Sequence, residues 1–215
     1  MVNGNMTEKS LAAIQDELAE LRTRVAQLEA EVEQDEPPPT EWTRGYYLTY
    51  YATTGFFLGM AGAVTSLLFN VAGAALTGRH PLQLIRVYLT FGLGERALQL
   101  QLNDGDGGLT LIIGCCLYIA TGMLLGVLFQ VVLSRLADRD SLVKRLLIAS
   151  LLGLAIWIVN YYLLLSWIQP LLFGGNWIVT QIPPTVAALT HLVFGWTMAL
   201  IYPLGKFEPY RVVTE

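Results

Sequence analysis

Polar residues that could do chemistry stand inside otherwise apolar stretches of this sequence. They are Asn70, Cys115, Cys116, Asn160 and His191. An imidazole in such surroundings can bind a haem or a metal ion, or hydrogen-bond the headgroup of a quinone. A helix rises about 1.5 Å per residue, so Asn70 lies roughly 9 Å from the outer end of its stretch, and the others lie at similar depth. The sequence defines one candidate polar layer, with Asn70, Asn160 and His191 as its candidate cofactor-binding residues.

The chemistry around His191 is incomplete for each of these roles. The sequence has one other histidine, His80, which lies outside the apolar stretches, so a bis-histidine haem site cannot form inside them. No Asp or Glu occurs there, and we interpret the adjacent Cys115 and Cys116 as small apolar residues. We therefore expect no catalytic residue, no metal and no cofactor. His191 is expected to be a structural residue that hydrogen-bonds Asn160 or a tyrosine hydroxyl.

The elements that must position these residues are four apolar stretches, residues 46–76, 108–134, 146–168 and 185–204. Each has at least about 20 residues, the length that a helix needs to cross roughly 30 Å of hydrocarbon. None contains Lys, Arg, Asp or Glu. A backbone in lipid must satisfy its own hydrogen bonds, which a helix does. The sequence predicts an all-α integral membrane protein whose domain 46–205 is a bundle of four transmembrane helices.

A heptad repeat precedes these stretches. Its apolar positions recur at alternating spacings of three and four: Leu11, Ile14, Leu18, Leu21, Val25, Leu28 and Val32. This pattern predicts a coiled-coil helix over residues 1–36, followed by a proline-containing linker over residues 37–45.

The charges beside the heptad seam indicate how the helix associates. Glu17 with Arg22, and Arg24 with Glu29, stand at the g and e positions that meet in a parallel assembly, and both pairs have opposite charges. We expect a parallel homo-oligomer. Association with a different chain, or a single amphipathic helix lying on protein or lipid, are the alternatives.

Charge is distributed unevenly along the chain. Residues 1–44 carry ten acidic and four basic side chains, a balance of −6, and the rest carries seven acidic and nine basic, a balance of +2, which together give −4. An acidic segment ahead of a weakly basic membrane body argues against a nucleic-acid partner. The first 45 residues contain no apolar core of the signal-peptide type, so we expect the N-terminus to be retained.

Basic residues near the ends of the spans predict the orientation. Placing both termini and the connection between spans two and three inside puts seven Lys and Arg residues inside and three outside. The three outside are Arg79, Arg86 and Arg96. We expect a multi-pass protein of the cell (inner) membrane with cytoplasmic N- and C-termini, including the tail 206–215.

The two outer connections are unusual. Residues 81–102 are too polar to span a membrane but rich in Leu, and they predict a helix lying in the outer interface that breaks near Gly92 and Gly94. Residues 170–184 carry no charge and are expected to lie along the outer boundary.

Small residues predict close helix contacts. Gly55 and Gly59 in the first span, and Gly122 and Gly126 in the second, each form a GxxxG motif that lets helix backbones approach. These four glycines are the predicted helix-packing residues, and the seven heptad residues are the predicted oligomerisation residues.

Function is less specified than architecture. The sequence has no nucleotide-binding loop, no GxSxG, HExxH or CxxC motif, and no carboxylate in a span to relay protons. The interpretation that fits is a non-enzymatic, oligomeric accessory, assembly or scaffold subunit of a larger membrane complex. The alternatives are a small oligomeric channel or carrier, or a redox-complex subunit that contacts quinone or haem.

Overall fold

A computed structural model describes residues 4–35, 41–76, 78–100, 108–137 and 141–207. The chain divides into two compact units, Met1–Arg44 and Gly45–Glu215. The predicted linker prolines, Pro37–Pro39, and residues 208–215 of the predicted tail lie outside the described residues. The described residues form helices and no strand, so the all-α class predicted from the sequence is confirmed.

The first unit is built around one long helix, α1 (Gly4–Asp35). No proline interrupts it, and good helix formers such as Ala, Leu, Glu, Gln and Arg make up most of its sequence. The described heptad side chains from Ile14 to Leu28 all lie on its exposed surface.

Helix α2 begins at Glu41, and its residues from Gly45 onward belong to the second unit. In chain order the elements are α2 (Glu41–Leu76), α3 (Gln83–Leu93), η1 (Gly94–Gln99), α4 (Gly108–Leu136), α5 (Leu142–Ile158), η3 (Val159–Leu164), α6 (Leu165–Phe173), α7 (Trp177–Gln181), α8 (Pro184–Ile201) and η4 (Tyr202–Gly205).

Four helices of this unit are long and apolar enough to cross a membrane: Tyr46–Leu76, Gly108–Leu136, Leu142–Phe173 and Pro184–Gly205. They match the four spans predicted from the sequence. The third is longer than predicted, beginning at Leu142 instead of residue 146 and ending at Phe173 instead of residue 168. Ser141 caps this helix by accepting a hydrogen bond from the Lys144 N–H at 3.4 Å. Because the first turn contains the charged Lys144, a search for uncharged apolar residues leaves that turn out.

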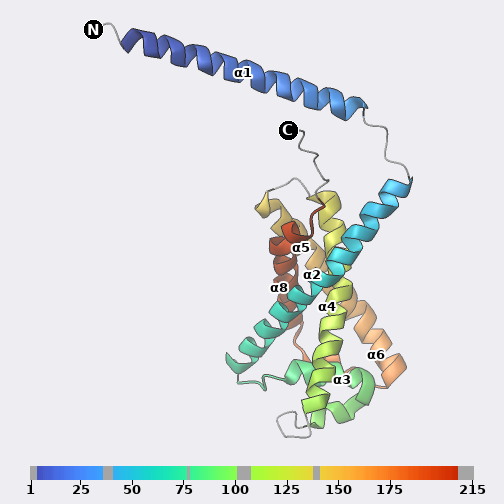
Figure 1. The fold of residues 1–215 in the computed structure, drawn as a ribbon. Helices are drawn as coiled ribbons and strands as arrows, with labels where there is room; N and C mark the ends of the chain where they lie inside the picture. Colours follow the sequence, from blue (N-terminus) through green and yellow to red (C-terminus); the bar gives the residue numbers. More distant parts are fainter. Residues whose placement is uncertain (1–3, 36–40, 77, 101–107, 138–140, 208–215) are drawn as a thin grey trace. The chain divides into compact units, whose positions relative to one another are not determined.

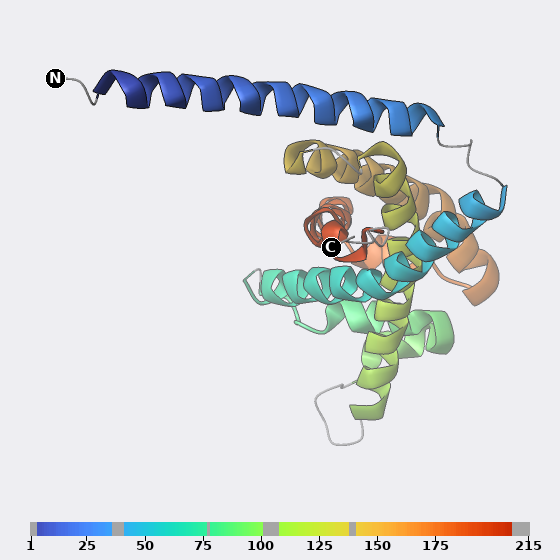
Figure 2. The ribbon, with the colours of Figure 1, turned by 45° about the horizontal axis from the view of Figure 1, so that its top comes forward.

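Successive spans run in opposite directions, and α2 crosses α4 steeply (Figures 1 and 2). A buried core joins α2, α4, α5 and α8 through Ala63, Phe129, Ala149 and Phe194. The rings of Phe129 and Phe194 meet edge to face with centroids 5.3 Å apart. We call the end of the bundle that carries α3 and α7 the α3 end, and the opposite end, where residues 206 and 207 contact the start of α2, the η4 end.

The third span changes its helical pitch near the α3 end. Its α-helix α5 passes into a π-helical turn, η3, before α-helix resumes in α6. The Ser166 hydroxyl donates to the Tyr161 carbonyl, five residues back, at 2.9 Å. The wider turn coincides with Tyr161, which is 3 % exposed and donates to the carbonyls of Val179 and Ile182 at 2.9 and 2.8 Å. The π turn and the hydroxyl thus connect the third span to α7.

The helix predicted between spans one and two is present as α3, and Gly94, with φ of +60°, ends it. Its burial differs from that of a helix lying on a surface. Ile85 and Leu89 pack against Gly114 of α4, and Val87 packs against Ile178 of α7. Because α4 begins at Gly108, the contact at Gly114 lies about 9 Å along α4 from its start. Helix α3 therefore packs inside the bundle end on at least two faces.

Candidate functional site

The candidate polar layer contains one hydrogen-bonded pair between spans one and four. The Asn70 amide donates to the Thr190 hydroxyl at 2.9 Å and to the Ser66 carbonyl at 2.7 Å. Asn70 is 8 % exposed, so burial makes these bonds necessary. Asn70 is thus tied to α8 at the residue next to His191.

A second polar contact joins spans one and two one turn away. The hydroxyls of Ser66 and Tyr118 lie 2.8 Å apart, and both residues are buried. The ring of Tyr118 packs against Tyr88 of α3, with centroids 4.9 Å apart. Burial, with a smaller contribution from Tyr118, raises the pKa of the Tyr88 hydroxyl well above its usual range. Tyr88 is therefore a neutral group at ordinary pH.

His191 hydrogen-bonds its own helix. Its Nδ1 lies 2.8 Å from the Ala187 carbonyl oxygen, four residues back. The carbonyl can only accept, so Nδ1 carries the proton and Nε2 is an acceptor in the neutral ring. The partner suggested by the sequence, Asn160 or a tyrosine hydroxyl, is not the one in the structure. The ring lines a small cavity together with Tyr88, Tyr118 and Thr121.

The size of this cavity limits what it can hold. Its volume is about 40 Å³, enough for one or two water molecules. Sites for drug-sized ligands and cofactors usually have volumes of about 300 to 1,000 Å³. The cavity beside His191 therefore has room for water but not for a quinone headgroup or a haem.

The remaining members of the layer lie elsewhere. Gly153 of α5 faces the backbone of His191, and Asn160 follows Gly153 by seven residues. That separation amounts to about 10 Å along the helix, so Asn160 lies nearer the α3 end than His191 does. Cys115 is half-buried and Cys116 exposed, and neither forms a disulfide. Counting residues from the span ends misplaced Asn160, because a count along one helix does not give the register between α5 and α8, and that register sets Gly153 against His191.

The predicted packing glycines lie at the crossing of α2 and α4. A Cβ added to Gly59 would stand 2.9 Å from the Cα of Gly126, and one added to Gly55 would stand 2.6 Å from the Gly126 carbonyl oxygen. Gly122 faces Ala63 in the same crossing. Contacts this short between a Cβ and backbone atoms are not tolerated, so the crossing requires glycine at these positions.

Sequence reasoning missed a buried glutamine that ties together the two connections at the α3 end. Gln169 of α6 is 0 % exposed. Its amide nitrogen donates to the Thr90 hydroxyl of α3 at 2.9 Å, and its carbonyl oxygen accepts the Ile178 N–H of α7 at 2.9 Å. One side chain thus joins α3, α6 and α7. A glutamine directly before the predicted uncharged connection was the available signal.

A second buried glutamine lacks partners. Gln130 of α4 is also 0 % exposed, and neither its amide nitrogen nor its carbonyl oxygen bonds to another described residue. Gly55 of α2 and Gly205 of η4 enclose it. A buried amide without partners costs free energy.

Among the described residues, no group of three or more His, Cys, Asp and Glu side chains is placed to hold a metal ion. No protein-family model, curated protein or solved structure matches this chain. The geometry of the chain itself is therefore the basis for assigning a function.

Proposed function

We propose that this chain is a non-enzymatic, multi-pass membrane protein whose N-terminal helix assembles it into a parallel oligomer. It serves in that form as an accessory, assembly or scaffold subunit of a larger membrane complex. One observation carries this proposal: no described residue covers the apolar seam of α1 between Ile14 and Leu28. Ile14, Leu18, Leu21, Val25 and Leu28 are 46 to 60 % exposed.

An uncovered seam of this kind supports association with a second helix. A straight helix 32 residues long with Leu, Ile and Val at a and d positions is stable in water when another helix covers the seam. The attractive pairs of Glu17 with Arg22 and Arg24 with Glu29 favour a second copy of this chain in parallel orientation. Exposed ion pairs contribute only a few tenths of a kcal/mol each, so they select the partner and contribute little strength.

Side chains of the membrane unit support a structural role. Asn70 of the candidate polar layer is paired with Thr190, and the neighbouring Ser66 is paired with Tyr118. Paired groups of this kind hold helices together. Three heptads are marginal alone, so we propose that the membrane helices also contribute to assembly.

Oligomer mass in mild detergent tests the role of the seam. Leu21→Lys keeps a good helix former but places a charge at a d position, whereas Ala19→Lys places the same charge at a b position outside the seam. We expect Leu21→Lys and the helix-breaking Leu21→Pro to reduce the oligomer, and Ala19→Lys to leave it intact. An oligomer unchanged in both Leu21 variants would assign assembly to the membrane helices.

Purification of the native protein in mild detergent, with its mass and visible spectrum recorded, tests the accessory role. Co-purifying large subunits would support it. A homo-oligomer alone would favour a channel or carrier, and a bound chromophore would favour a redox subunit.

A further inference from the structure

Two hollows meet at the α3 end of the bundle. The polar hollow has a volume of about 500 Å³, and its lining includes Gln83, Thr180 and Gln181. The apolar hollow has a volume of about 530 Å³ and lies between α2 and α8, with Phe69 and Leu189 among its walls. Arg79 lines both, as do Gln83 and Gln181, so the two hollows adjoin, and we call them together the groove.

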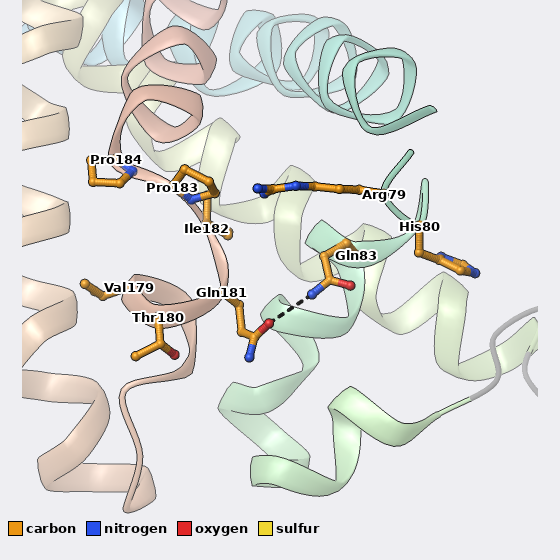
Figure 3. A pocket seen from close by; sticks show the side chains of 9 residues that line it. All are labelled: Arg79, His80, Gln83, Val179, Thr180, Gln181, Ile182, Pro183 and Pro184. Carbon is orange, nitrogen blue, oxygen red and sulfur yellow. Dashed lines mark hydrogen bonds between the residues drawn. The ribbon is translucent and has the colours of Figure 1, made fainter. Parts of the chain in front are cut away.

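Arg79 carries an unpaired positive charge at the junction of the hollows. Its side chain reaches across toward Pro183 and Ile182 (Figure 3). Its backbone N–H donates to the Ala74 carbonyl, but its guanidinium makes no hydrogen bond or ion pair with any other described residue. Below it, the Gln83 amide donates to the Gln181 carbonyl oxygen at 3.3 Å and closes the floor. A guanidinium held over a polar floor binds phosphate well.

Other groups around the groove make it electropositive. Helix α8 begins at Pro184, which lines the polar hollow, so the positive end of its dipole lies there. In the described part of residues 45–207 the one carboxylate is Glu95, which lines neither hollow. The groove therefore attracts negative charge and offers no carboxylate to a cationic headgroup.

A second pair of donors stands beside the groove. The Leu82 N–H donates to Nδ1 of His80 at 3.1 Å, so in the neutral ring Nε2 carries the proton. Nε2 then lies 3.4 Å from a terminal guanidinium nitrogen of Arg86, which is also a donor. The His80 ring points away from the space in front of Arg79 (Figure 3), so this pair contributes charge near the groove but does not line its centre.

The position of the groove matches the two parts of a lipid. Apart from Pro184, the polar hollow is lined by residues outside the apolar spans, such as Arg79 and Thr180. The apolar hollow extends from the residues that it shares with the polar hollow to the last turns of span one and the first turns of span four. A ligand filling both would place its charged group beyond the ends of the spans and its chain along the helices.

We infer that this groove binds one anionic phospholipid, with its phosphate against Arg79 and an acyl chain between α2 and α8 against Phe69, Val186 and Leu189. The unpaired guanidinium and the lack of a carboxylate in the groove select an anionic headgroup over one that carries a choline or an ammonium group. The site is independent of the coiled coil in α1.

Lipid binding to the purified full-length protein tests this inference. Native mass spectrometry would compare retention of phosphatidylglycerol and of phosphatidylcholine with the same acyl chains. We expect one phosphatidylglycerol per chain to be retained preferentially. Arg79→Gln should weaken its binding roughly ten-fold, because a charge-assisted bond is lost. Arg96→Gln, which removes an exposed arginine that lines neither hollow, should not change it. Equal retention of both lipids, or equal loss in both variants, would overturn the inference.

A second comparison tests the apolar half of the site. Gly73 lines the apolar hollow, and a Cβ added there meets nothing within 4 Å, so Gly73→Leu should fill the hollow without disturbing the fold. Gly92→Leu is the matched control, since Gly92 is equally open and lies outside both hollows. We expect Gly73→Leu to reduce phosphatidylglycerol binding and Gly92→Leu to preserve it. Glycerol phosphate without acyl chains should not displace the lipid at millimolar concentration. Displacement would show that the site takes a free phosphate group and not a lipid. Full lipid binding in Gly73→Leu would show that no acyl chain occupies the apolar hollow, and would overturn the inference as well.

Discussion

Gln130 and Gln169 are both fully buried, but their amides are in opposite situations. Gln169 has partners for its nitrogen and its oxygen, whereas Gln130 has none among the described residues. Removing a polar group that lacks partners relieves its desolvation cost, and removing a partnered one leaves other groups unsatisfied. The two residues therefore form a matched pair.

We expect Gln130→Leu to stabilise the protein by about 1 kcal/mol and Gln169→Leu to destabilise it by about 2 kcal/mol. The second variant leaves the Ile178 N–H without its acceptor. Thermal unfolding in detergent would measure both. A larger loss for Gln130→Leu than for Gln169→Leu would mean that the Gln130 amide binds a partner, such as a water molecule or a second chain.

His191 should tolerate replacement by another polar residue. His191→Gln keeps hydrogen-bonding capacity beside a cavity of about 40 Å³ and changes no bond between helices, because the bond of His191 lies within α8. We expect fold, oligomer mass and complex formation to be nearly unchanged, with an effect of about 0.6 kcal/mol or less. Loss of a bound chromophore or metal in a folded variant would instead identify His191 as a ligand.

At the scale of elements, the crossing of α2 and α4 depends on backbone contact. Gly59 faces the backbone of α4, whereas Gly73 of the same helix faces open space. We expect Gly59→Ala to destabilise the protein by about 1 to 3 kcal/mol through overpacking. Gly73→Ala should stabilise it by about 0.5 to 1 kcal/mol, because alanine is the better helix former. Thermal unfolding of the two variants in the same detergent would compare them, and equal effects would rule out a close crossing.

The direction of the proposed coiled coil can be tested with the charges of α1. Arg22→Glu places a carboxylate where a parallel neighbour presents Glu17, and Glu17→Arg combined with Arg22→Glu restores an opposite pair. We expect the single variant to weaken the oligomer and the double variant to recover it, with a difference of a few tenths of a kcal/mol per pair. Oligomer mass at low and high salt would measure this, since high salt should remove the difference. Failure of the double variant to recover would argue for a different partner or direction.

At the scale of the whole molecule, the property to establish is the side of the membrane on which the two termini lie. Single cysteines at Asn5 and at Thr214, the latter outside the described residues, would be placed in a background with Cys115 and Cys116 changed to Ala. Both should resist a membrane-impermeant maleimide in intact cells, because seven of the Lys and Arg residues near the span ends then lie inside and three outside. Labelling of either cysteine would reverse the orientation and place the Arg79 groove at the opposite leaflet.

The sequence by itself determined the all-α class, the four apolar helices and the helix between the first two of them. Length and the absence of charge decide whether a helix can cross hydrocarbon, and both are local properties. The glycines of the two GxxxG motifs can also be recognised as packing residues from the sequence, because only a residue without a Cβ allows helix backbones to touch.

The tertiary structure alone decided which polar groups meet. Asn70 bonds Thr190, which is 120 residues away in the sequence. Gln169, which joins α3 to α7, bonds Thr90 across 79 residues. Partner choice depends on how helices rotate and cross, which a count along one helix does not contain. The same reason explains the position of Asn160 away from His191, and the groove at Arg79, whose walls come from the ends of α2 and α8 and from the two connections between spans.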